Sequence, residues 1–144
     1  MKKLSIVLAA AFLSAACAKS AITGPKQSTL MTTVVGSWAL TQGCGGIAYR
    51  CTGAGSLTVP NLVVFYSNGT TDLFRAGVKV GSGTFTITPS ASDSLRAGTL
   101  VMTPGLEAAT DSLTLNFSIE GELMLAEPCC DRLTYSFFKA NAPD

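Results

Sequence analysis

The sequence predicts an all-β protein, an eight-stranded antiparallel up-and-down barrel, with a two-sheet β-sandwich as the alternative. Apolar residues alternate with polar ones, many of them Ser or Thr, in one segment after another. This alternation is typical of strands that have one buried and one solvent-exposed face. Short turn-forming sequences separate most of these segments. Closing such strands into a barrel removes the exposed sheet edges.

The first 16 residues have the layout of a secretory signal peptide. Lys2 and Lys3 are basic, residues 4–13 are apolar, and small residues follow. The apolar run is shorter than the roughly 20 residues that a transmembrane helix needs. We therefore expect residues 1–16 to direct export and to be removed.

Cys17 directly follows the small residues of the signal peptide. This junction resembles the lipobox of bacterial lipoproteins, in which the cysteine is lipidated and becomes the new N-terminus. The alternative is an ordinary secreted protein that is cut after Ala16 or Ala18. Ala18 is not the aspartate that retains such lipoproteins in the inner membrane. The resemblance therefore implies a lipoprotein of the bacterial cell envelope that is anchored in the outer membrane. It does not say whether the protein lies on the periplasmic or the surface face.

Residues 17–33 have no apolar period and contain Gly24-Pro25. We expect a lipidated N-terminus followed by a flexible tether. An N-terminal arm that packs on the domain is the alternative. The folded domain is then expected to span residues 34–144.

The first expected strand, residues 34–41, places Trp38 and Leu40 on the inner face. A Gly-rich connection, residues 42–60, follows it. Asn68-Gly69 is a hairpin signal that ends the second strand, and we interpret residues 81–83 as a turn between the third and fourth strands. The expected strands after the first are residues 62–66, 71–80, 84–88, 99–103, 112–119, 122–127 and 132–139.

Five cysteines leave one thiol outside any set of pairs. If Cys17 carries lipid, Cys44, Cys51, Cys129 and Cys130 remain, and an oxidising compartment can pair them. In an up-and-down barrel the end of the first strand lies beside the start of the last strand. We therefore expect disulfides from the first two of these cysteines to the last two. The alternative, a Cys44–Cys51 bond, would remove this cross-link but not the fold. A thiolate metal site fits less well, because the chain has no histidine and adjacent cysteines lack the usual zinc-site spacing.

Gly36-Ser37-Trp38 resembles the G-x-W signature of lipocalins. The domain is similar to the short lipocalin-like lipoproteins of bacteria, with residues 65–70 (FYSNGT) and 130–135 (CDRLTY) matching their general pattern. The resemblance implies a lipocalin-like barrel whose tryptophan plugs a closed end beneath a basic side chain, for which Lys139 is the candidate. Two features depart from the family: the T-D-x-Y signature is missing, and no helix follows the barrel.

Composition argues against several classes of function. With no histidine, the chain has no Ser-His or Cys-His catalytic pair, and it contains no phosphate-binding loop. Without Lys2 and Lys3, 8 of the 10 basic residues remain against 9 acidic ones, so the expected mature chain has a net charge of about −1 and no basic patch that would argue for nucleic acid. We therefore expect a monomeric protein that is not an enzyme and needs no cofactor or metal.

Two functions remain, and both are binding functions. The first is to bind or carry a small apolar ligand inside the barrel; the second is to bind a protein partner while large side chains fill the barrel. In an up-and-down barrel residues 42–60, 104–111 and 128–131 share one rim. We expect any ligand or partner contact at this rim, where Tyr49, Arg50 and Glu107 are exposed contact candidates. The candidate lining residues are Trp38, Leu40, Phe65, Phe74, Phe85, Leu113, Leu115, Phe117, Leu123, Leu125, Tyr135 and Phe137.

Overall fold

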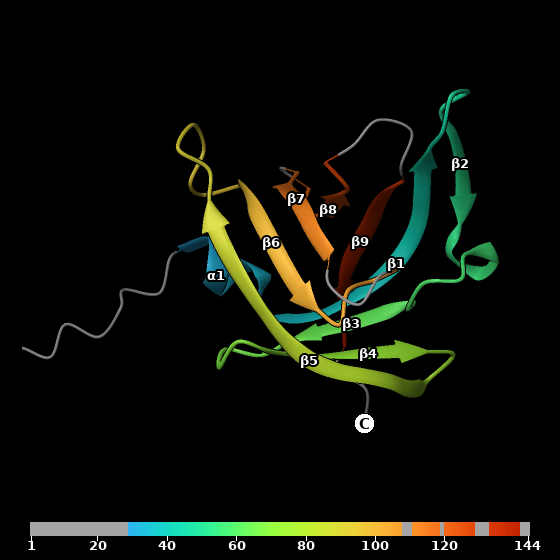
Figure 1. Ribbon diagram of the computed structural model, residues 1–144, viewed down its shortest axis with the longest axis horizontal. Coiled ribbons are helices and arrows are strands. Elements are labelled where there is room, and N and C mark those ends of the chain that lie inside the picture. The colour runs from blue at the N-terminus through green and yellow to red at the C-terminus, as the bar shows by residue number, and fades with distance from the viewer. Residues whose placement is uncertain (1–28, 108–110, 119, 129–132, 142–144) are drawn as a thin grey trace, which may run out of the picture.

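The computed structural model describes residues 29–107, 111–118, 120–128 and 133–141 (Figure 1). An α-helix, α1 (Thr29–Val34), precedes the strands, and a short 3-10 helix spans Ala54–Ser56. The strands are β1 (Gly36–Gly45), β2 (Arg50–Gly53), β3 (Leu62–Phe65), β4 (Thr70–Arg75), β5 (Val78–Pro89), β6 (Ala97–Thr103), β7 (Asp111–Phe117), β8 (Leu123–Ala126) and β9 (Thr134–Ala140).

All of these strands belong to one antiparallel sheet in the order β2-β1-β3-β4-β5-β6-β7-β8-β9. A further pairing of β1 with β9, from Ser37↔Ala140 to Cys44↔Thr134, closes the sheet on itself. Eight strands therefore form a closed up-and-down barrel. The remaining strand, β2, pairs with residues 42–45 in the second half of β1. The predicted barrel is confirmed, and the β-sandwich is excluded by the β1–β9 pairing.

The predicted turn at residues 81–83 is wrong, because these residues lie inside β5. The chain turns instead at Ala76 and Gly77, which both have positive φ angles (50° and 77°). Gly83 allows a close approach of β5 to β6, since a Cβ at this position would collide with the carbonyl oxygen of Thr103. Gly83, which resembles a turn residue in the sequence, thus serves strand packing.

α1 lies against the barrel beside the end of β5 (Figure 1). Its Leu30 and Val34 side chains are fully buried and belong to the main core. The expected tether is therefore wrong for residues 29–33, where the alternative of a packed N-terminal arm holds. The expected signal peptide, Cys17 and the rest of the expected tether lie outside the described residues. Within the described part of the chain, no helix is long and apolar enough to cross a membrane.

The strand directions give the barrel two distinct ends. We call the end formed by α1, the start of β1 and the end of β9 the closed end. The opposite end, which we call the distal rim, carries the β1–β2 hairpin and the connections after β6 and β8. The expectation that the connections beginning at residues 42, 104 and 128 share one end is confirmed by this topology, although residues 108–110 and 129–132 are outside the described part.

Candidate functional site

The closed end is built around Trp38. Its indole Nε1–H donates a hydrogen bond to the Val34 carbonyl oxygen at 2.6 Å, which ties β1 to the C-terminus of α1. The Lys139 Nζ atom lies 4.6 Å from the centre of the Trp38 ring and donates to the Val35 carbonyl oxygen at 2.8 Å. The expected placement of a basic side chain over this tryptophan is confirmed at Lys139.

Gly36 provides the space for Lys139. It has a φ of 128°, and a Cβ there would lie 2.8 Å from the lysine Nζ atom. Burial lowers the pKa of Lys139, because it disfavours the charged ammonium. The aromatic ring and the backbone carbonyl both favour the charged form and therefore limit this decrease. The closed end is a packed and hydrogen-bonded plug.

Among the described residues, large apolar side chains pack together inside the barrel. Leu115, Leu125 and Phe137 have 0% accessible surface, so none of them borders a space that a water molecule could enter. Ring contacts join Trp38 to Phe117 at 5.5 Å and Phe65 to Phe85 at 4.8 Å between centroids. The other expected lining residues found in the same core are Leu40, Leu113, Leu123 and Tyr135.

Phe74 is the expected lining residue that does not reach the interior. The alternation of β4 buries Thr71 and Leu73, and Phe74 lies half-buried on the outer face. The prediction placed Phe74 on the wrong face of the sheet, because it treated residues 71–80 as a single strand. Deeply buried Val63, Leu100 and Met102 were missing from the predicted lining, although their positions in alternating segments indicate burial.

At the distal rim, Cys44 forms a disulfide with Cys51, which is its direct partner across the β1–β2 hairpin. The expected bonds from these two cysteines to Cys129 and Cys130 are therefore wrong. β1 continues to Gly45 and returns as β2, which brings the two Cα atoms to 4.0 Å. Cys44 does lie beside the last strand as expected, opposite Thr134, but Cys129 and Cys130 are outside the described residues.

The hairpin beyond this disulfide carries the most exposed apolar side chains of the rim. Ile47 is 96% exposed and Tyr49 is 73% exposed, and Arg50 beside them is also exposed. Tyr49 has a φ of 42°, and its N–H donates to the Gly46 carbonyl oxygen at 2.9 Å. The predicted exposure of Tyr49 and Arg50 is confirmed, whereas Ile47 was not predicted from the sequence.

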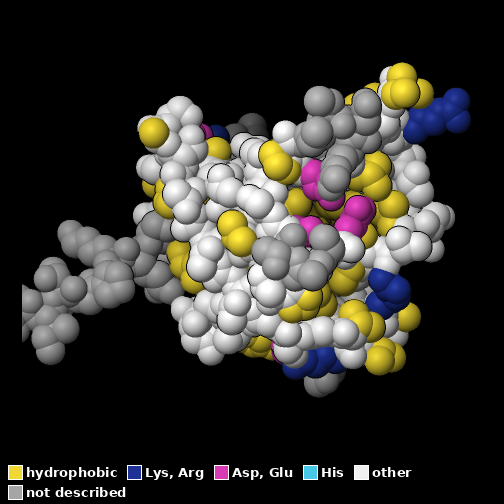
Figure 2. Space-filling view, viewed as in Figure 1, with side chains coloured by type: hydrophobic (Ala, Val, Ile, Leu, Met, Phe, Trp, Pro, Cys, Tyr) yellow, Lys and Arg dark blue, Asp and Glu magenta, His cyan; other side chains and the backbone are white. Residues whose placement is uncertain are grey.

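Glu107, the third predicted rim residue, is exposed but held in place. The buried Tyr135 donates its hydroxyl hydrogen bond to Glu107 Oε1. The backbone N–H of Glu107 donates to Asp111 Oδ2 at 3.0 Å. Asp111 is itself buried and was not predicted. Figure 2 shows acidic side chains gathered beside hydrophobic ones in one area of the visible face, with the basic side chains at its edges.

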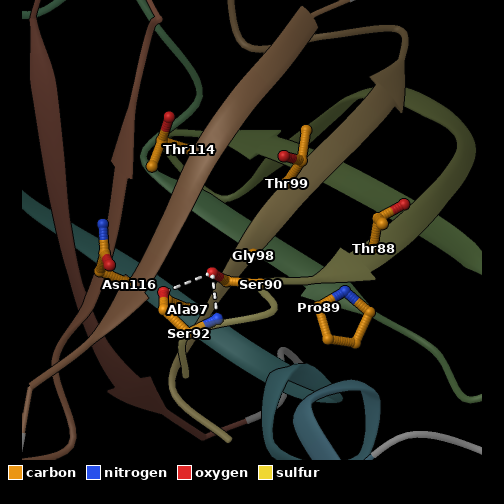
Figure 3. Close-up of a pocket in the computed structure, with 9 residues that line it drawn as sticks. All are labelled: Thr88, Pro89, Ser90, Ser92, Ala97, Gly98, Thr99, Thr114 and Asn116. Atoms are coloured by element: carbon orange, nitrogen blue, oxygen red, sulfur yellow. Dashed lines mark hydrogen bonds between the residues drawn. The ribbon is translucent and has the colours of Figure 1, made fainter. Parts of the chain in front are cut away.

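A separate pocket of about 410 Å³ lies on the outer wall of the barrel, away from the distal rim (Figure 3). Its walls come from the ends of β5, β6 and β7 and from the loop between β5 and β6. The sequence did not predict it, because its residues belong to the polar faces of three strands. Their proximity follows from strand register, which the alternation alone does not give.

No protein family, curated protein or solved structure matches this chain. Among the described residues, no group of three or more His, Cys, Asp or Glu side chains could hold a metal ion. The geometry of the barrel and of its surface therefore carries the functional argument.

Proposed function

We propose that this protein is a lipid-anchored binding protein of the bacterial cell envelope, with a lipocalin-like barrel as scaffold and the distal rim as the contact surface for a protein partner. The observation that carries this proposal is the close packing of the described core side chains inside the barrel. Core side chains with no accessible surface leave no space among them for a ligand. The exposed binding groups instead gather on the β1–β2 hairpin.

The chemistry of the hairpin suits a protein contact. Tyrosine and arginine are enriched among the residues that dominate binding energy in protein interfaces. Ile47 and Tyr49 together offer an apolar surface that gains free energy when it is removed from water. The Cys44–Cys51 disulfide joins the strands just below them, so the hairpin loses less conformational freedom on binding.

The proposed lipid on Cys17 would orient the barrel. The chain reaches α1 at Thr29, at the closed end. Residues 17–28 can span at most about 40 Å when fully extended. The closed end would thus lie nearer the membrane than the distal rim, with the hairpin directed away from the bilayer.

Site-specific photo-crosslinking tests the proposed contact. A benzoylphenylalanine in place of Tyr49 should give one defined adduct in cells that produce the protein. The same group in place of Thr86, which is exposed on the outer wall of β5, is the matched control and should not give it. An Ile47→Ser change should weaken the Tyr49 adduct. Equal labelling from both positions would contradict a contact at the rim.

Metabolic labelling tests the anchor. A fatty-acid probe should label the wild-type protein and not the Cys17→Ser variant. An unlabelled mature protein that begins at another residue would contradict lipidation.

Binding of a small apolar ligand is the second candidate. The Trp38–Lys139 arrangement favours it, because it matches what the lipocalin resemblance implies, and Figure 2 shows hydrophobic side chains exposed beside the acidic area. N-phenyl-1-naphthylamine, whose fluorescence rises in apolar surroundings, is the probe. Saturable binding of one probe per protein would favour this candidate, and no saturable signal would exclude it.

We propose no catalytic activity, since the chain has no histidine and no catalytic motif.

A further inference from the structure

The outer-wall pocket is formed where three strands and one loop meet. Thr88, Thr99 and Thr114 lie side by side on β5, β6 and β7, because the strand register pairs the first with the second and the second with the third. Asn116 lies two residues further along β7, opposite Ala97. The loop after β5 adds Ser90 and Ser92, as Figure 3 shows.

The polar side chains of the strands have unused hydrogen-bonding capacity. Thr88, Thr99, Thr114 and Asn116 make no side-chain hydrogen bond to any described residue. Each hydroxyl can both donate and accept, and the amide has two donor hydrogens and an acceptor oxygen. The pocket therefore presents donors and acceptors together, at the spacing of adjacent strands, roughly 4.8 Å.

The loop side of the pocket is held in one shape. The Ser90 and Ser92 hydroxyls hydrogen-bond to each other at 2.9 Å, and the Ser92 N–H also donates to Ser90 Oγ. Asp93 Oδ1 accepts from the backbone N–H groups of Leu95 and Arg96, at 3.2 and 3.1 Å. These bonds fix the loop before any ligand arrives, which lowers the entropy cost of binding.

The lining contains no charged side chain. A charged ligand would lose hydration here without gaining an opposite charge, which is unfavourable. Pro89, Ala97 and the threonine methyl groups add small apolar surfaces between the polar groups. A ligand that fits must be neutral, carry several hydroxyl or amide groups, and have C–H faces between them.

We propose that this pocket binds a neutral saccharide. Sugars combine closely spaced hydroxyls with C–H faces, and the lining offers hydrogen-bonding groups and small apolar surfaces together. The volume of about 410 Å³ falls within the range of roughly 300–1,000 Å³ of small-molecule sites. This site lies on the outer wall near the closed end, so it does not depend on the partner contact proposed for the distal rim.

Amide NMR of the full mature protein tests the proposal, with N-acetyl-D-glucosamine and maltose as the probes. At least one of the two should produce saturable shifts at the amides of Ala97, Thr99 and Asn116. We expect a Kd of about 1 mM, because each hydrogen bond to a sugar replaces one to water. Glucuronate, which carries a charge, should bind at least tenfold more weakly.

Substitutions that keep the side-chain shape test whether the saccharide binds in this pocket. Thr99→Val removes a lining hydroxyl at nearly constant shape and should weaken binding about 3- to 10-fold, and adding Asn116→Leu should weaken it further. Thr86→Val makes the same change on the outer face of β5 but outside the pocket, and should leave binding unchanged.

Absence of saturable shifts with both saccharides would overturn the proposal. Equal loss of binding in the Thr86 and Thr99 variants, or tighter binding of glucuronate, would also overturn it. The wild-type amide spectrum should be retained in each variant, which separates loss of the site from loss of the fold. Failure here would leave the proposed rim contact unaffected, because the pocket and the rim contact share no residue.

Discussion

At the closed end of the barrel, Trp38 is buried, hydrogen-bonded to α1 and covered by the Lys139 ammonium. At the distal rim, Ile47 is almost fully exposed and Tyr49 is mostly exposed, on a hairpin that a disulfide braces. Both regions belong to the same strand and its continuation, and each contains aromatic and basic side chains. Burial, and not residue type, therefore distinguishes Trp38, which stabilises the fold, from Tyr49, which is a candidate contact residue.

The largest expected difference in stability is between two alanine variants, one at Trp38 and one at Tyr49. Trp38→Ala should lower the free energy of unfolding by about 4 kcal/mol, because it removes a buried ring and leaves a cavity. Tyr49→Ala should change it by less than about 0.5 kcal/mol, because its side chain is mostly in water. Urea unfolding of both variants measures the contrast. Similar losses in the two variants would break the comparison.

A smaller effect is expected at α1. Leu30→Ala should cost about 3 kcal/mol, since this side chain is fully buried against the barrel. Thr33→Ala, on the exposed side of the same helix, should cost less than about 1 kcal/mol. Thermal unfolding of the two variants at equal concentration provides the measurement. If Leu30→Ala is neutral, residues 29–34 do not belong to the folded core.

At the rim, replacing both Cys44 and Cys51 with serine should lower stability by about 2 kcal/mol, because the disulfide closes only a short loop. The closed end should keep its structure, seen as unchanged fluorescence of the sole tryptophan. Peptide mapping of the oxidised wild type should recover Cys44 linked to Cys51. Recovery of either cysteine linked to Cys129 or Cys130 would contradict the hairpin.

The smallest effect concerns pH. Because burial lowers the pKa of Lys139, the folded protein releases this proton at a lower pH than the unfolded chain. The unfolded state then binds more protons between the two pKa values, so the free energy of unfolding rises with pH in that window. The window ends near the ordinary lysine pKa of about 10.4. Lys139→Met should lack this rise, and a stability difference that stays flat with pH would contradict it.

The closed end was largely predictable from the sequence. Period-two alternation assigned Trp38, Phe85, Leu115 and Phe137 to the interior, and the lipocalin resemblance indicated the pairing with Lys139. These features depend on local pattern or on a short motif. They survive errors in the exact strand boundaries.

The rim and the outer wall were less predictable for physical reasons. β2 has no alternating pattern, so neither the hairpin nor its Cys44–Cys51 bond could be inferred from periodicity. Gly81 and Gly83 have the composition of a turn, and only the neighbouring strand shows why β5 needs a glycine at position 83. The outer-wall pocket depends on the register of three strands, which alternation leaves undetermined.

The central claim is that the barrel interior is scaffold, and that contacts are made outside it. Native mass spectrometry of the protein, recovered under non-denaturing conditions from the cells that make it, tests this claim most directly. We expect the mass of the mature chain with its proposed lipid and no further tightly held molecule. A stoichiometric apolar molecule that is released only when the barrel unfolds would contradict it.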